Sequence, residues 1–197
     1  MPRGVQLNMI RSVCALLVLC SAVAVAQPTP PQNMSKEALS AERMEIYRDF
    51  MHGYNNGSNS VLNVSQLTIA FSPDESDQKG CLSKFSAKDL VTPAVHTFSG
   101  DAFPGLAVRL VDPKTHKGKD PGDAIRGGAS VDDAVKAGFA AGLFTFSEIA
   151  FDADHTHAAF SFSFWCGSLC GHGGVIIYEL SNGKWKQSKA QCGRWIS

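Results

Sequence analysis

Hydrophobic and polar residues alternate through much of the last third of the chain, and a period of two is typical of β-strands. The segment HAAFSFSFW shows it most clearly, with Phe160, Phe162 and Phe164 on one side. Asn182 and Gly183 tolerate the positive φ angles of a tight turn, so they predict an antiparallel hairpin between the last two strands. Strands are expected at residues 61–71, 106–111, 145–151, 157–165, 175–180 and 185–190.

Two other segments have the spacing of amphipathic helices. The first follows Ser35 as its cap and ends between residues 52 and 57, where HGYNNG supplies helix breakers. Its apolar face consists of Leu39, Ile46, Tyr47 and Phe50. The second begins at a capping box of Ser130 and Asp133 and runs until Gly142. Its apolar positions are Val131, Ala134, Val135 and Phe139.

These elements predict an α+β fold. We expect an antiparallel β-meander of about four or more strands, with the N-terminal amphipathic helix and the second short helix packed on one face. Residues 82–90 are compatible with a further short helix. Residues 112–129 are rich in Gly, Pro and Lys and predict a long loop.

The first 26 residues form a separate pattern. Arg3 and Arg11 precede an apolar run that ends in the triplet Ala24-Val25-Ala26, which is typical of a secretory signal peptide. The run is about 14 residues long, too short for a transmembrane helix, and no comparable stretch follows. The predicted organisation is therefore a signal peptide at 1–26, a Pro-rich flexible lead at 27–34 and a single α+β domain at 35–197. The expected location is secreted or periplasmic.

Charge and cysteine content narrow the function classes. Without residues 1–26 the chain has 16 Lys and Arg, since Arg3 and Arg11 are lost from 18, against 18 Asp and Glu. This balance, without a basic block, gives no reason to expect nucleic acid as a partner.

Four of the six cysteines remain, and in an exported chain they predict two disulfides. Three pairings are possible. Cys166 with Cys170 is favoured as the local pair, which leaves Cys81 with Cys192.

The strand at 157–165 also suggests a binding face. Its odd positions place His157, Ser161, Ser163 and Trp165 opposite the three phenylalanines. An ordinary solvated face of a sheet explains this pattern. A shallow binding surface built around Trp165 is the functional alternative.

Catalytic chemistry has little support in the sequence. Ser168 lies in CGSLCG, which lacks the strand-to-helix setting of a nucleophile elbow, and the cysteines there lack the C-x-x-C spacing of thiol oxidoreductases. Metal binding is the stronger alternative, because imidazole and thiolate suit zinc or copper. Its ligands would come from His155, His157, Cys166, Cys170 and His172.

The C-terminal half, from FSEIAFD through CGSLCG and GKW to the final WIS, resembles a group of uncharacterised exported bacterial proteins. EIYRDFMHGY is similar to the opening helix of that group. The resemblance implies export and brings no catalytic residue, ligand or cofactor.

The sequence therefore indicates an exported, non-catalytic domain without a cofactor. Its ligand is expected to be a small molecule, a peptide or the cell envelope. A metal or thiol protein centred on the Cys-Gly-His segment remains the alternative.

Overall fold

A computed structural model describes residues 36–55, 60–92, 95–168 and 170–197, with the side chains of 36–40 and 191 left out. The predicted signal peptide, the Pro-rich lead and the Ser35 cap lie outside these residues. The helices are α1 (Lys36–Tyr54), α2 (Glu75–Lys79), α3 (Pro121–Arg126) and α4 (Val131–Ala141). The strands are β1 (Leu62–Ser65), β2 (Val108–Val111), β3 (Leu143–Phe146), β4 (Ala150–Phe151), β5 (His157–Trp165), β6 (Gly171–Ser181) and β7 (Lys184–Ile196).

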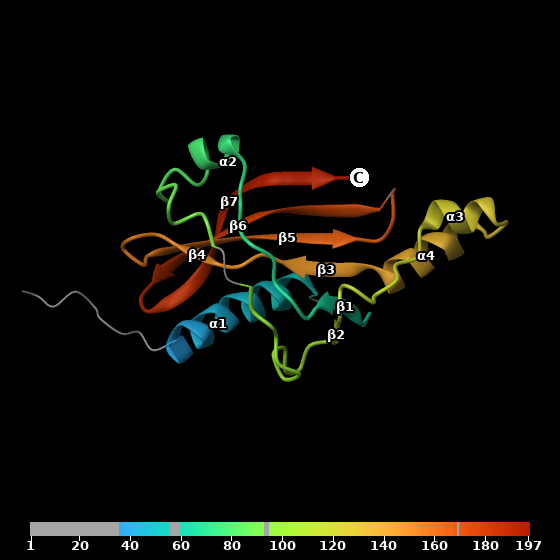
Figure 1. Ribbon diagram of the computed structural model, residues 1–197, viewed down its shortest axis with the longest axis horizontal. Coiled ribbons are helices and arrows are strands. Elements are labelled where there is room, and N and C mark those ends of the chain that lie inside the picture. The colour runs from blue at the N-terminus through green and yellow to red at the C-terminus, as the bar shows by residue number, and fades with distance from the viewer. Residues whose placement is uncertain (1–35, 56–59, 93–94, 169) are drawn as a thin grey trace, which may run out of the picture. The chain divides into compact units, whose positions relative to one another are not determined.

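The predicted α+β class is confirmed. One seven-stranded sheet has the order β2-β1-β3-β5-β6-β7, and β4 pairs with β5 beside β3 (Figure 1). The sheet is mixed, because β1 pairs in parallel with both β2 and β3. The remaining pairs are antiparallel, and β5, β6 and β7 follow one another as two hairpins.

One face of the sheet carries the main core. Helix α1 lies along this face and buries Ile46, Tyr47 and Phe50 against it (Figure 1). Phe50 meets Phe160 edge to face, with ring centroids 5.4 Å apart, a favoured aromatic geometry. Burial raises the pKa of Tyr47, whose hydroxyl donates to the Ser147 carbonyl at 2.6 Å. These three residues of the predicted apolar face pack on the sheet, and Leu39 lies outside the side chains that the structure describes.

The opposite face is not simply solvated. Residues 71–90, including α2, pack over part of it and bury Ala159, Val175 and Ile177 with Phe71 and Leu82. Small Ala159 and the apolar odd positions of β6 allow this second layer to approach the sheet. The interpretation of the odd face of β5 as an ordinary wet face is therefore wrong for its first half.

Several predicted boundaries shift in the structure. Residues 82–90 form successive turns, and the helix of this region is α2, capped by Asp74, whose side chain accepts from the Asp77 N–H. The loop at 112–129 contains α3, because Asp120 and Pro121 provide a cap and a favourable first residue. The expected strand at 61–71 is regular only as β1, and β2 begins at Val108 rather than residue 106.

The glycines after Cys170 lie in a strand rather than a loop. Strand β6 begins at Gly171 and so includes Gly173 and Gly174. A Cβ atom at Gly173 would lie 2.6 Å from Nε1 of Trp195, a residue of β7. The absence of a side chain lets the indole lie across β6, so the strands continue further than the sequence pattern indicates.

Two local predictions are confirmed. Ser130 caps α4, because its hydroxyl accepts from the Asp133 N–H at 3.1 Å, as the capping box requires. The Asp133 carboxylate accepts from the Ser130 hydroxyl at 2.7 Å rather than from the Ser130 main-chain N–H. Asn182 and Gly183 adopt φ angles of 53° and 71° and connect β6 to β7. Within the described ranges, no helix combines the length and the apolar character needed to cross a membrane.

Candidate functional site

A groove of about 670 Å³ lies on the α1 face of the sheet. One wall is the C-terminal end of α1, with Phe50 and Tyr54, and the other is formed by α3 and α4. Strands β5, β6 and β7 provide the floor. We call this space the apolar groove. Its principal side chains are Phe50, Tyr54, Ile125, Val131, Val135, Phe139, Phe162, His172, Ile176, Gln187, Arg194 and Ile196.

The wall from α4 is exposed and apolar. The spacing of Val131, Val135 and Phe139 predicts a face packed on the core, yet Val131 is 60% and Phe139 52% exposed. The buried residues of α4 are Ala134 and Gly138. The prediction holds only in part, since α4 stacks the Phe139 ring on Phe164 of β5, with centroids 5.7 Å apart, and leaves Val131 and Val135 exposed. Its larger apolar side chains consequently face the groove, and such an exposed patch is typical of a binding surface.

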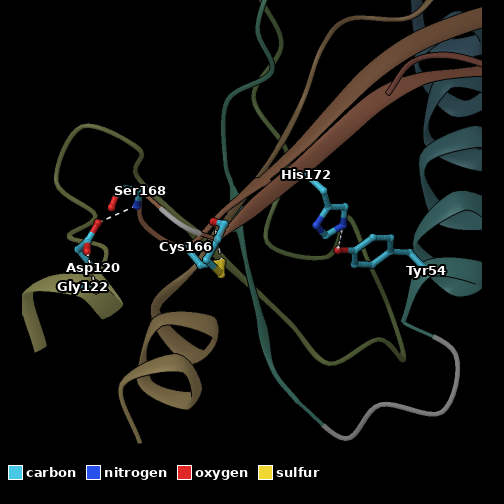
Figure 2. Close-up of a disulfide and its surroundings, with 7 residues drawn as sticks. Tyr54, Asp120, Gly122, Cys166, Ser168 and His172 are labelled. Atoms are coloured by element: carbon cyan, nitrogen blue, oxygen red, sulfur yellow. Dashed lines mark hydrogen bonds between the residues drawn. A yellow bond between two sulfur atoms is a disulfide. The ribbon is translucent and has the colours of Figure 1, made fainter. Parts of the chain in front are cut away.

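A neutral hydrogen-bonded pair stands at one side of the groove. The Tyr54 hydroxyl of α1 and Nε2 of His172 in β6 are 2.8 Å apart and face each other (Figure 2). Burial lowers the pKa of His172 and raises that of Tyr54 to about 12, so both groups are uncharged at neutral pH. The pair adds polar atoms to the groove without adding charge.

Arg194 is the single charged side chain among the described residues that line the groove. It forms no ion pair or hydrogen bond with another described residue. Its Cγ lies above Gly174, where a Cβ atom would be 3.3 Å away, so the arginine stem extends over the α1 face of β6. The groove therefore combines a long apolar surface with one unpaired positive charge.

The segment at residues 166–168, which we call the Cys-Gly loop, holds the α3 wall. Asp120 accepts hydrogen bonds from the N–H groups of Gly122 and Ser168, each at 2.7 Å, and so joins the start of α3 to the loop (Figure 2). The pKa of Asp120 is lowered, and the hydrogen bonds from Ser168 are the largest cause. Gly167 has a φ of 121° and meets Pro121, where a Cβ atom would be 2.6 Å from Cδ. Only glycine fits this position, so the loop positions the groove wall.

The cysteines form two pairs in the structure. Cys81 and Cys192 have a Cα separation of 6.2 Å, and Cys166 and Cys170 have one of 5.1 Å. These are the pairs favoured by the sequence. Cys166 is fully buried and lines the groove together with Cys170.

The residues of the metal alternative do not come together. His155 binds Glu42 at 2.9 Å, whereas His157 binds Asp152 and Lys84, each at 2.8 Å. His172 pairs with Phe164 across the sheet, seven residues along β5 from His157, which corresponds to about 23 Å. Cys166 and Cys170 are consumed in a disulfide. No group of three potential metal ligands gathers anywhere in the described part of the chain.

The four residues of the predicted binding face have different surroundings. His157 lies near Phe85, and its Nδ1 faces Asp152. Burial acts to raise the pKa of Asp152, but hydrogen bonds from His157 and Thr156 outweigh it and lower this pKa. Trp165 is half exposed and lies against Gly118. Only Ser161 and Ser163 share a hollow, of about 300 Å³.

A polar cluster around Glu148 was not predicted by any pattern in the sequence. Glu148, 1% exposed, follows β3 and accepts hydrogen bonds from Thr68, from the main-chain N–H of His96 at 2.9 Å and from Arg43 at 3.3 Å. Nδ1 of His96 lies 2.8 Å from the same carboxylate. These residues are far apart in the sequence, and the cluster joins α1, the loop at residue 96 and the sheet.

Comparisons of the chain with protein-family models, with curated proteins and with solved structures found no match.

The pKa of His172 predicts a pH dependence of stability. Below the ordinary histidine value of 6.5 the unfolded chain binds a proton that folded His172 does not yet bind. The free energy of unfolding should therefore fall as the pH drops from 6.5 through the lowered folded value. We expect His172→Gln to remove this component in urea denaturation at a series of pH values. The exposed His52→Gln is the control, and identical pH profiles of wild type and His172→Gln would contradict the prediction.

Proposed function

We propose that the protein is an exported, non-catalytic domain that binds an amphipathic anion, such as a fatty carboxylate, in the apolar groove. The observation that carries the proposal is the combination of a groove of about 670 Å³, apolar on both walls, with the unpaired Arg194. Pockets of this size and composition are typical of small-molecule sites.

The chemistry of the groove favours this ligand class over others. An apolar chain removes the exposed faces of Phe139, Val131 and Ile196 from water, which is favourable in proportion to the area covered. A carboxylate adds charge-assisted hydrogen bonds from the Arg194 guanidinium. No carboxylate side chain lines the groove among the described residues.

Three observations support export. Disulfides form and persist in oxidising compartments, and both cysteine pairs of the domain are at bonding distance. The pattern of residues 1–26 and the resemblance to exported bacterial proteins agree with this location. The paired cysteines give no support to a metal or thiol function.

The proposal is tested by calorimetric titration with dodecanoate and with dodecanol, which share a chain and differ in the head group. We expect dodecanoate to bind, and dodecanol to bind about fivefold more weakly, because Arg194 is exposed and its charge is partly screened. Arg194→Gln should remove the difference between the two ligands.

Lys189→Gln, on the same strand but outside the groove, is the matched control and should leave both affinities unchanged. Phe139→Ala should weaken both ligands alike, since it removes only apolar contact. Failure of both ligands to bind the wild-type protein would refute the function. Equal affinities of wild type for both ligands would refute the role of Arg194.

A further inference from the structure

A second hollow lies on the opposite face of the sheet from the apolar groove. It has a volume of about 300 Å³ and opens where residues 71–90 no longer cover the strands. We call it the hydroxyl pocket. The side chains that define it are Thr145, Ser161, Ser163, Asp77 and Trp195.

Three hydroxyl groups form the base of this pocket. Thr145 lies directly opposite Ser163 in the β3–β5 pair, and Ser161 is two residues along the same face of β5. Opposite residues are about 5 Å apart and next neighbours on one face about 7 Å. None of the three hydroxyls bonds to another side chain or main-chain group in the described residues. Each can donate and accept, so the row offers unused hydrogen bonds over the width of a sugar ring.

Trp195 forms the aromatic side of the pocket. Its indole lies across β6 at Gly173, where a Cβ atom would be 2.6 Å from Nε1. The side chain is 41% exposed, and within the described chain its Nε1–H has no hydrogen-bond partner. An open ring with a free N–H at its edge can contact an apolar surface and donate a hydrogen bond at the same time.

The charge of the pocket limits its ligand. Asp77 is buried and accepts from the N–H of Gly193. Burial, followed by the nearby Asp74, raises the pKa of Asp77. Both acids line the pocket, and no cationic side chain does so among the residues the structure describes. An anionic ligand is therefore disfavoured, and a purely apolar ligand would leave the hydroxyls unpaired.

We propose that the hydroxyl pocket binds a neutral saccharide, with the C–H face of a pyranose ring on Trp195 and its hydroxyls on Thr145, Ser161 and Ser163. The volume, at the small end of ligand pockets, suits a single sugar unit. The sugar could be free or part of an envelope glycan, since both present the same ring. This site lies on the other face of the sheet from the apolar groove, although Val175 and Trp195 line both hollows, and it does not rest on the function proposed for the groove.

The test is an NMR titration of the folded, disulfide-bonded protein with maltotriose and with triacetylchitotriose. We expect at least one of them to shift the Trp195 indole N–H and the amides of Ser161 and Ser163. Ser161→Ala with Ser163→Ala should weaken that binding about tenfold, because two hydrogen bonds are lost. The amide signals of the double variant outside the pocket should match those of wild type, which shows that it is folded.

Trp195→Phe keeps an aromatic face and removes the N–H, and Trp165→Phe is its control outside the pocket. The first should weaken saccharide binding and the second should not. Cosedimentation with insoluble cell-wall glycan then separates the sources, since a glycan-bound sugar retains the protein and a free sugar does not. The proposal is overturned if neither saccharide shifts the pocket signals, if the double variant binds equally well, or if only a cation such as spermidine shifts them.

Discussion

Replacing Cys81 and Cys192 with alanine is expected to lower the free energy of unfolding by about 5 kcal/mol. The bond closes a loop over a sequence separation of 111 residues, and the chain-entropy model assigns such a loop this order of stabilisation. The pair also joins the segment that covers the second face of the sheet to β7. Urea denaturation under non-reducing conditions measures the loss.

The variant lacking Cys166 and Cys170 is the matched control. This pair closes a separation of four residues, for which the same model gives about 2 kcal/mol. Because the local loop holds the α3 wall, its loss should weaken dodecanoate binding more than loss of the long-range pair does. Equal losses of stability in the two variants would contradict the entropic argument. Peptide mapping that joins Cys166 to Cys192 would contradict the pairing itself.

Glu148→Gln is expected to lower the free energy of unfolding by about 3 kcal/mol. The substitution keeps the size of the side chain but removes the negative charge that faces Arg43 and His96. Removing one partner of a buried charge network leaves the other charges uncompensated, which costs about 3 to 5 kcal/mol. We use the lower end of that range because His96 is 45% exposed. Thermal and urea unfolding of the purified variant measure the effect.

Glu45→Gln provides the comparison for this variant. Glu45 is an exposed residue of α1, and neutral substitutions at such positions change stability by less than about 0.5 kcal/mol. Thr68→Val should produce an intermediate loss, since it removes one hydrogen bond to the carboxylate and keeps the charges. A Glu148→Gln variant as stable as Glu45→Gln would show that the cluster contributes no net stability.

Local chemistry accounts for the elements that the sequence predicted well. Strand β5 spans His157–Trp165 as expected, because its phenylalanines alternate with smaller residues over its whole length. Helix α4 spans Val131–Ala141, since Ser130 caps it and Gly142 ends it. The β6–β7 turn follows from two residues that accept positive φ angles. Each of these features depends on neighbours in sequence.

Elements shaped by distant contacts were predicted poorly. Gly171, Gly173 and Gly174 have the composition of a loop, and they form a strand because β5 and β7 pair with them from both sides. The second layer over the sheet had no pattern of its own, since turns rather than a periodic helix carry its apolar side chains. No sequence pattern distinguishes Glu148 from other acidic residues, because its surroundings come from three distant segments, at Arg43, Thr68 and His96.

The sequence by itself determined the α+β class, the ends of several helices and strands, and the favoured cysteine pairs. Tertiary structure alone decided where the candidate sites lie. The apolar stripe of α4 has the same spacing whether it packs on a core or faces a groove. Only the fold, in which Ala134 and Gly138 are buried while Val131 and Phe139 stay largely exposed, distinguishes the two. Tyr54, His172 and Arg194 come from α1, β6 and β7, so their proximity depends on sheet order and register, which are long-range properties.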